Sequence, residues 1–270
     1  MIRHLTNRIQ YRIAAPAMTI AALGALVLAA CGSSSDATAR GAETSGGTAL
    51  AKTANPAPIH GPYSPQIDPA NFVARIDNPL LPFKPGTTLR YRGVAENGKT
   101  PQLDTETVTQ QTKRIMGVEC AVIRDTVSSR GKPVERTLDW YAQDRKGNVW
   151  YFGEDARDFQ NGHFVKASDS WQAGVDGAQP GVIMEAHPKP GDAYRQEYYP
   201  GHAVDQAKVL GHSAVKVPYR SFPKALVTVE RSALEPGTLE KKYNVAGIGV
   251  VAERVTKGNH ERFDLVGVKK

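Results

Sequence analysis

The sequence predicts a mostly β protein, with a single antiparallel, curved sheet or half-barrel-like domain and one long irregular insertion. Short runs of alternating apolar and polar residues recur from residue 87 to the C-terminus, and turns that contain glycine join them. No stretch keeps the helical period for more than about two turns. The segment 155–205 lacks clean alternation and is rich in glycine and proline, which is typical of a functional or mobile loop.

The first thirty residues predict a signal peptide. Basic residues, with no acidic residue among them, precede an apolar stretch at 13–30 that ends in small side chains. Leu28-Ala29-Ala30-Cys31 resembles a bacterial lipobox, and the resemblance implies cleavage before Cys31 and attachment of lipid chains such as palmitate to it. A plain secretory cleavage or an uncleaved anchor is the alternative. We therefore expect a lipid-anchored protein of the bacterial cell envelope that faces the periplasm or the cell surface.

Residues 31–65 predict a lipidated cysteine followed by a disordered tether. From Gly32 onward this stretch has few large apolar side chains, so it cannot bury enough surface to order itself. The β domain is then expected at 66–270. Removal of residues 1–30 takes away three arginines and no acid, which lowers the formal charge from +7 to +4. This charge is too balanced to favour a nucleic acid as a partner.

The elements of the domain follow in chain order. A short helical turn is expected at 68–72, and the apolar residues 78–83 should pack on the edge of the sheet. Strands are expected at 87–95, 104–115, 118–129, 134–143, 148–154, near 193–198, at 206–217 as a pair bent at Gly211, and at 225–231, 239–245, 250–255 and 261–268. Strands of this length joined by short glycine turns indicate an antiparallel meander.

The hairpin at 134–154 is the clearest element. Its turn, Asp144-Arg145-Lys146-Gly147, has the residues of a type I turn that ends in a glycine bulge. If Asp144 lies opposite Asn148, the cross-strand pairs are Ala142–Trp150, Trp140–Phe152 and Tyr141–Tyr151.

The two faces of this hairpin have different expected environments. Leu138, Trp140, Trp150 and Phe152 form an apolar face that should be core. The face with Tyr141 and Tyr151 is either a second, thinner core or an exposed stacking surface. Asp139 and Glu154 lie near each other, but on different sides of the sheet in this register, which disfavours a pair of catalytic carboxylates.

Several motifs carry a resemblance to known proteins. Asp139-Trp140-Tyr141-Ala142-Gln143-Asp144, Gly147-Asn148-Val149-Trp150-Tyr151-Phe152-Gly153-Glu154 and Leu234-Glu235-Pro236-Gly237 resemble a family of uncharacterised bacterial secreted proteins and lipoproteins. The resemblance covers most of residues 70–268 and implies no particular chemistry. The pattern of strands is also similar to the curved sheets of lipoprotein-carrier proteins, which is a likeness of fold only.

The sequence lacks the motifs of the common enzyme classes, such as G-x-S-x-G, HExxH and the P-loop. Cys120 shares a strand face with Val118 and Val122, which indicates a buried, unreactive thiol. Glu185 and His187 could supply two metal ligands, with His202 or Asp205 completing a site. Solvated polar residues near turns are the alternative, and we expect neither a metal nor a cofactor.

The stretch from Trp171 to Tyr199 is the predicted ligand-binding segment, because it combines apolar surface with polar groups outside the regular strands. The candidate residues are Trp171, Met184, Glu185, His187, Glu197, Tyr198 and Tyr199. The alternative is that these side chains only fix a long loop to the core.

The sequence thus favours a non-catalytic envelope lipoprotein that is held at the membrane by its N-terminal lipid. Its expected partner is a small apolar or aromatic ligand, or another envelope protein. Two alternatives stay open: a hydrolase or metal-dependent enzyme with its site on the 155–205 insertion, and a purely structural envelope protein.

Overall fold

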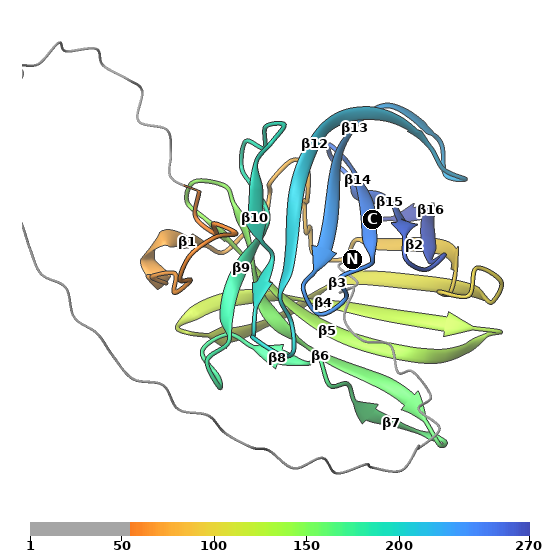
Figure 1. Cartoon of the computed structure of the whole chain (residues 1–270), viewed down its shortest axis with the longest axis horizontal. Helices are drawn as coiled ribbons and strands as arrows, with labels where there is room; N and C mark the ends of the chain where they lie inside the picture. Colours follow the sequence, from red (N-terminus) through yellow and green to blue (C-terminus); the bar gives the residue numbers. More distant parts are fainter. Residues whose placement is uncertain (1–54) are drawn as a thin grey trace, which may run out of the picture. The chain divides into compact units, whose positions relative to one another are not determined.

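The computed structural model describes residues 55–270. The expected signal peptide, Cys31 and the tether before Asn55 lie outside the described residues. The predicted fold class is confirmed, because the chain forms one antiparallel, 16-stranded sheet that curves into a nearly closed barrel (Figure 1).

A 3₁₀ helix at Pro69–Asn71 precedes the strands, and Asp68 caps it as expected. The strands are β1 (Phe72–Val73), β2 (Thr88–Val94), β3 (Pro101–Ile115), β4 (Val118–Ser129), β5 (Lys132–Asp144), β6 (Val149–Gln160), β7 (His163–Lys166), β8 (Trp171–Gln172), β9 (Gln179–Met184), β10 (Ala193–Arg195), β11 (Glu197–Tyr198), β12 (Asp205–Lys216), β13 (Ser221–Ser232), β14 (Leu239–Val245), β15 (Gly249–Lys257) and β16 (Arg262–Lys269). Their order along the sheet is β10-β12-β13-β14-β15-β16-β2-β3-β4-β5-β6-β9-β11.

The two ends of this path meet at Gln196. β10 pairs with β12 at one end, β11 pairs with β9 at the other, and Gln196 alone separates β10 from β11 in the sequence. The N–H of Gln196 donates to the carbonyl of Asp205 at 2.8 Å. The chain therefore passes from one end of the sheet to the other within one residue, and this crossing brings the two ends of the nearly closed barrel together.

The segment 155–205 is more regular than the sequence indicates. It contains the end of β6 and all of β7 to β11, and β9 and β11 complete the barrel wall. The sequence hides β9 because five of its six residues are buried, so the strand shows no alternation. The expected strand pair at 206–217 is the single strand β12, with a bulge between Val209 and Gly211.

The folded part of the chain begins earlier than the expected boundary at residue 66. Ala57 is completely buried, and Pro58 forms a β-bridge with Tyr194. The hydroxyl of Tyr63 donates to the carbonyl of Pro180 at 2.7 Å. Residues 55–65, which the composition assigns to the tether, thus lie against β9 and β10.

The hairpin has the expected pairs Ala142–Trp150 and Tyr141–Tyr151, but its register shifts between Tyr141 and Asp139. The extra residue lies on β6 near Gly153. The φ of this residue is 118°, a backbone conformation that glycine adopts readily and other residues rarely do. As a result Asp139 lies directly opposite Glu154. The expectation that these two carboxylates occupy different sides of the sheet is wrong.

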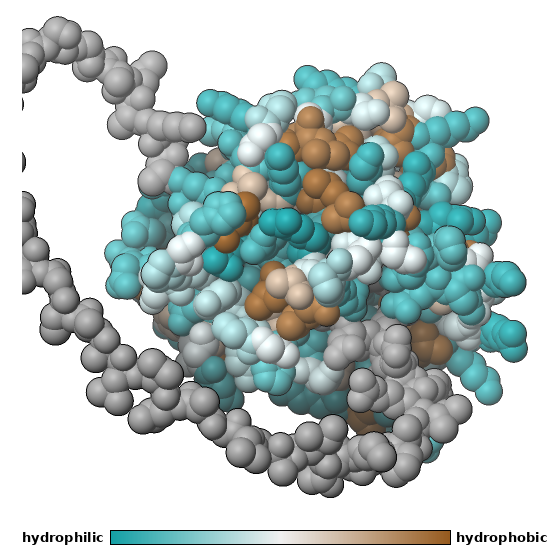
Figure 2. Space-filling view, viewed as in Figure 1, coloured by the Kyte–Doolittle hydropathy of each residue, from teal (hydrophilic) through white to brown (hydrophobic). Residues whose placement is uncertain are grey.

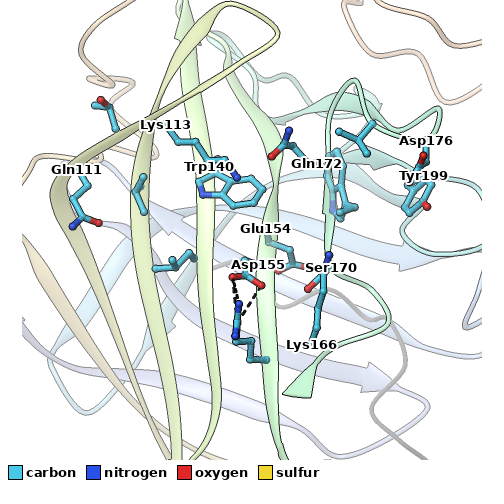
Figure 3. A pocket seen from close by; sticks show the side chains of 16 residues that line it. Gln111, Lys113, Trp140, Glu154, Asp155, Lys166, Ser170, Gln172, Asp176 and Tyr199 are labelled. Atoms are coloured by element: carbon cyan, nitrogen blue, oxygen red, sulfur yellow. Dashed lines mark hydrogen bonds and ion pairs between the residues drawn. The ribbon is translucent and has the colours of Figure 1, made fainter. Parts of the chain in front are cut away.

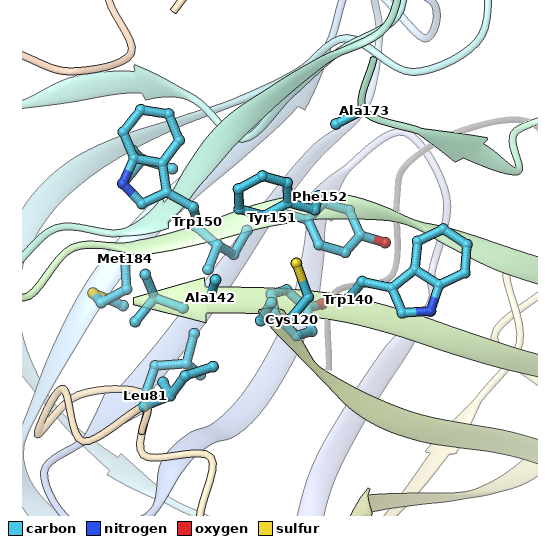
Figure 4. Packing of buried hydrophobic residues seen from close by; sticks show 14 of the residues in the cluster. Leu81, Cys120, Trp140, Ala142, Trp150, Tyr151, Phe152, Ala173 and Met184 are labelled. Atoms are coloured by element: carbon cyan, nitrogen blue, oxygen red, sulfur yellow. The ribbon is translucent and has the colours of Figure 1, made fainter. Parts of the chain in front are cut away.

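Both faces of the hairpin are covered. Tyr141 and Tyr151 are 1% and 0% exposed, and their rings stack at a centroid distance of 4.8 Å inside the barrel. The alternative of an exposed tyrosine surface is therefore wrong. On the other face Trp140, Trp150 and Phe152 are buried as expected, whereas Leu138 remains 36% exposed. Figure 4 shows Trp140, Trp150, Tyr151 and Phe152 with their neighbours in the larger of two apolar clusters.

The thiol of Cys120 belongs to this core and is completely buried. Burial raises its pKa to about 12, so the thiol stays protonated at physiological pH. The prediction of a buried thiol is confirmed.

On the face displayed in Figure 2, apolar side chains form separate patches between hydrophilic ones rather than one continuous area.

Candidate functional site

A groove of about 800 Å³ lies on the outer face of β4, β5 and β6. Val122, Leu138 and Trp140 form its apolar floor, and residues 111–113 of β3 form one wall (Figure 3). The opposite wall comes from β7, β8 and the turn after β8. The other lining residues are Glu154, Asp155, Arg157, Lys166, Ser170, Trp171, Gln172, Val175, Asp176 and Tyr199.

Lys113 covers the indole of Trp140. Its Nζ lies 3.3 Å from the centre of the indole ring, which is the geometry of a cation–π contact. A register shift between Val108 and Thr112 adds extra residues to β3 just before Lys113. Partial burial lowers the pKa of Lys113, since the ammonium loses water here. A ligand that stacks on Trp140 must therefore share the indole with this flexible side chain or displace it.

The groove is lined by charges of both signs. Lys113, Arg157 and Lys166 are basic and Asp155 and Asp176 are acidic, whereas the buried carboxylate of Glu154 lies on the side of Asp139. Arg157 and Asp155 neutralise each other through an ion pair at 3.0 Å. The groove therefore offers polar groups with little net charge to select an ion.

The hydroxyl of Ser170 has a structural role. It accepts from the N–H of Ala156 at 2.8 Å and donates to the carbonyl of the same residue at 2.9 Å. Because its proton and a lone pair are both engaged in these hydrogen bonds, Ser170 holds the segment that precedes β8 against β6.

Two of the predicted ligand-binding residues, Trp171 and Tyr199, line the groove, and a third, Glu197, is bonded to Trp171 without lining it. The indole N–H of Trp171 donates to Oε2 of Glu197 at 2.8 Å, and its ring lies edge-on to Tyr151. Glu197 is completely buried. This bond ties β8 to β11, so Trp171 supports the closed barrel as well as the groove wall. Tyr199 stacks on the imidazole of His202 at 4.2 Å.

The other four predicted residues do not line the groove. Met184 is buried in the core opposite Val149. Tyr198 lies edge-on to Tyr63 and below the guanidinium of Arg195. Glu185 and His187 follow β9, where His187 is exposed. The sequence interval from Trp171 to Tyr199 is therefore spread over several surfaces.

Sequence reasoning missed the floor of the groove and its β3 wall. Leu138 and Trp140 alternate along β5, and that alternation was assigned to core because both residues are apolar. No sequence pattern indicated that Lys113 lies at the groove, because its position over Trp140 depends on the bulge in β3. Arg157 was inside a segment expected to be irregular, whereas it extends β6 and faces outward beside Leu138.

The described residues give no support for a metal site at the sequence candidates. Within 55–270, no group of three or more His, Cys, Asp or Glu side chains is placed to hold a metal ion. In the same range, no helix has the length and apolar character that crossing a membrane requires.

Glu185 generates a testable prediction about pH. Burial, followed by the nearby carboxylate of Asp192, raises the pKa of Glu185 to about 7. A carboxyl whose pKa is raised on folding binds its proton more tightly in the native state, so stability falls as pH rises from about 4.5 to about 7. Glu185→Gln should therefore gain stability relative to the parent at pH 8, and gain less at pH 5.

Urea denaturation of both proteins at the two pH values measures this difference. Glu119→Gln, at an exposed position on β4, is the control and should show the same difference from the parent at both values. A Glu185→Gln effect that does not change with pH would contradict the prediction.

No protein-family model and no curated protein matches the sequence. Among solved structures, the chain is similar to a Bacteroides fragilis protein that is provisionally described as exported and as having a YmcC-like fold, with 14% identity, a TM-score of 0.43, and coverage of 71% of this chain and 99% of that one. It is also similar to a provisionally described lipoprotein from Parabacteroides distasonis, with 9% identity, a TM-score of 0.39, and coverage of 70% and 98%. Likenesses this distant do not establish a family or a function for this chain.

Proposed function

We propose that this protein is a membrane-anchored lipoprotein of the bacterial envelope that binds a small molecule in the groove on β4, β5 and β6, without catalysing a reaction. The groove carries this proposal. It has the volume and the mixture of an apolar floor and polar walls that small-molecule sites have. The envelope location and the lipid anchor rest on the signal sequence and on the lipobox that Leu28-Ala29-Ala30-Cys31 resembles.

The lining favours an uncharged ligand with an apolar or aromatic face. Trp140 and Leu138 supply an apolar floor, while Gln111 and Gln172 supply amide groups that can donate or accept at the walls. A strongly charged ligand would meet both acidic and basic side chains and gain little from them. The ligand's polar edge is then recognised by the walls and its flat face by the floor.

The same contacts favour binding over hydrolysis. Ser170 uses its hydroxyl to hold the backbone of Ala156, and Asp155 is engaged by Arg157. A nucleophile or a general base needs a free lone pair directed at the substrate. These groups instead stabilise the groove wall.

The groove is tested by filling it. Val175→Arg places a long cation at the rim, where Val175 is 45% exposed, so the fold should be unaffected. We expect the variant to bind the uncharged aromatic probe N-phenyl-1-naphthylamine about tenfold more weakly than the parent, a loss of about 1.4 kcal/mol. Fluorescence titration of the probe measures the affinity.

Leu234→Arg is the matched control, because Leu234 is similarly exposed at 40% and does not line the groove. It should bind the probe as the parent does. Equal affinities for all three proteins, or no binding by the parent, would contradict the assignment of the groove as a ligand site.

The anchor is tested in the native envelope. The parent protein should remain with the membrane fraction in high salt and enter solution only with detergent, because buried lipid chains hold it there. Cys31→Ala should leave the protein uncleaved by the lipoprotein peptidase and without its diacylglyceryl group. Recovery of an unmodified mature parent protein in the soluble fraction would refute lipid anchoring.

A further inference from the structure

The outer face of β2 to β7 is basic. Residues paired directly across antiparallel strands lie on the same face of a sheet, so the register identifies the side chains that share this face. Within residues 55–270, three neighbouring rows of such pairs carry six exposed basic side chains and one acid, Asp155. Figure 1 shows β3 to β7 side by side in one wall. The basic face is formed by Arg90, Arg92, Arg124, Arg136, Arg157 and Lys166.

Three cations of the basic face lie directly opposite one another. Arg136 on β5 is opposite Arg157 on β6, and Arg157 is opposite Lys166 on β7. Like charges in such positions repel each other and destabilise a sheet. Asp155 neutralises Arg157 at 3.0 Å, but within residues 55–270 no ion pair neutralises Arg136 or Lys166. This row therefore keeps positive charge that an anion outside the protein can compensate.

Large apolar side chains are exposed between these cations. Leu103, which is opposite Arg92, is 50% exposed, and Phe159 is 46% exposed. Cζ of Arg136 lies 4.4 Å from the centre of the Phe164 ring, and this ring packs edge-on to Phe159. A single exposed apolar residue is ordinary on a protein surface, whereas here several of them share one face with arginines.

This combination fits the surface of an anionic membrane. Arginine binds phosphate oxygens in a bidentate manner, and basic side chains close to an anionic lipid surface are attracted to it. Exposed leucine and phenylalanine side chains gain free energy when they insert among lipid headgroups, which a soluble polyanion does not offer. The choice of a membrane as the partner rests on the proposed envelope location, since the anchor would hold the domain beside such a surface.

We infer that the basic face docks on an anionic phospholipid surface, with its arginines against the headgroup phosphates and with Leu103 and Phe159 among the headgroups. Arg157 and Lys166 belong to this face and also line the groove, so the groove would lie at the edge of the docked face. Docking would fix the orientation of the domain at the membrane, which a flexible tether alone does not do.

Cosedimentation with lipid vesicles tests this inference. The protein is the whole mature chain, residues 31–270, made without its signal peptide so that Cys31 carries no lipid. Its binding then reports on the basic face whether or not the anchor proposal holds. The chain should bind vesicles of phosphatidylglycerol and phosphatidylcholine in equal parts at least about tenfold more tightly than vesicles of phosphatidylcholine alone.

Salt should reverse this binding. Sodium chloride at about 1 M shortens the Debye length to about 3 Å, so it should release most of the bound chain. Equal binding to both kinds of vesicle, or binding to neither, would overturn the inference.

Charge reversal tests whether the basic face is responsible. Arg124→Glu with Arg136→Glu changes two exposed side chains that do not line the groove, so N-phenyl-1-naphthylamine should bind as it does to the parent. Binding to the anionic vesicles should weaken by about tenfold or more. Lys208→Glu with Lys224→Glu, at exposed positions on β12 and β13, is the matched control with the same change in net charge and should stay within about twofold of the parent. Equal losses in both double variants would show a response to net charge alone and contradict docking through this face.

A third variant separates a lipid surface from other anions. Leu103→Ser with Phe159→Ser keeps every charge and alters no residue that lines the groove. It should bind the anionic vesicles about tenfold more weakly, because the inserted apolar surface is lost. Undiminished binding would indicate a site for anionic polymers in general and overturn the assignment to a membrane.

Discussion

The structure depends on the crossing at Gln196. The residues on either side of it pair with opposite ends of the sheet, so the two edges are held together by a continuous chain. β9 must approach this crossing closely, and a Cβ at Gly181 would lie 2.3 Å from the carbonyl carbon of Gln196. The indole N–H of Trp171 adds a further link when it donates to Glu197. An open sheet would expose both edges to water and to other chains, whereas this crossing brings the two edges together.

Closure gives each strand an inside and an outside with different chemistry. On the β5–β6 hairpin, Tyr141 and Tyr151 face the acidic interior, while Trp140 and Leu138 face the groove. The proposed groove therefore occupies only the outer face of this wall, where it depends on an apolar floor between acidic and basic side chains.

The sequence predicts the parts of the fold that have a regular alternation and a recognisable turn. The hairpin pairs Tyr141–Tyr151 and Ala142–Trp150 follow from the turn at Asp144 alone. β9 could not be predicted, because burial on both faces removes its alternation, and two-residue strands such as β8 carry no period at all.

The candidate site was predictable only in part, for a related reason. Trp171 and Tyr199 were found because they are aromatic residues in an unassigned segment. Leu138 and Lys113 were missed, because the groove is formed by residues from separate strands. The side of the sheet on which each of these side chains lies depends on β-bulges. The bulge near Gly153 also moved Glu154 to the side of Asp139, which a fixed period of two cannot anticipate.

Hydrogen exchange of the backbone amides of residues 193–198 tests the closed barrel most directly. The N–H of Gln196 is bonded to Asp205, and that of Arg195 to Ala57. These amides should therefore exchange about as slowly as those in the centre of β4 and β5, and open only with the whole domain. Fast exchange at 193–198, with β4 and β5 still protected, would show an open sheet and contradict the account.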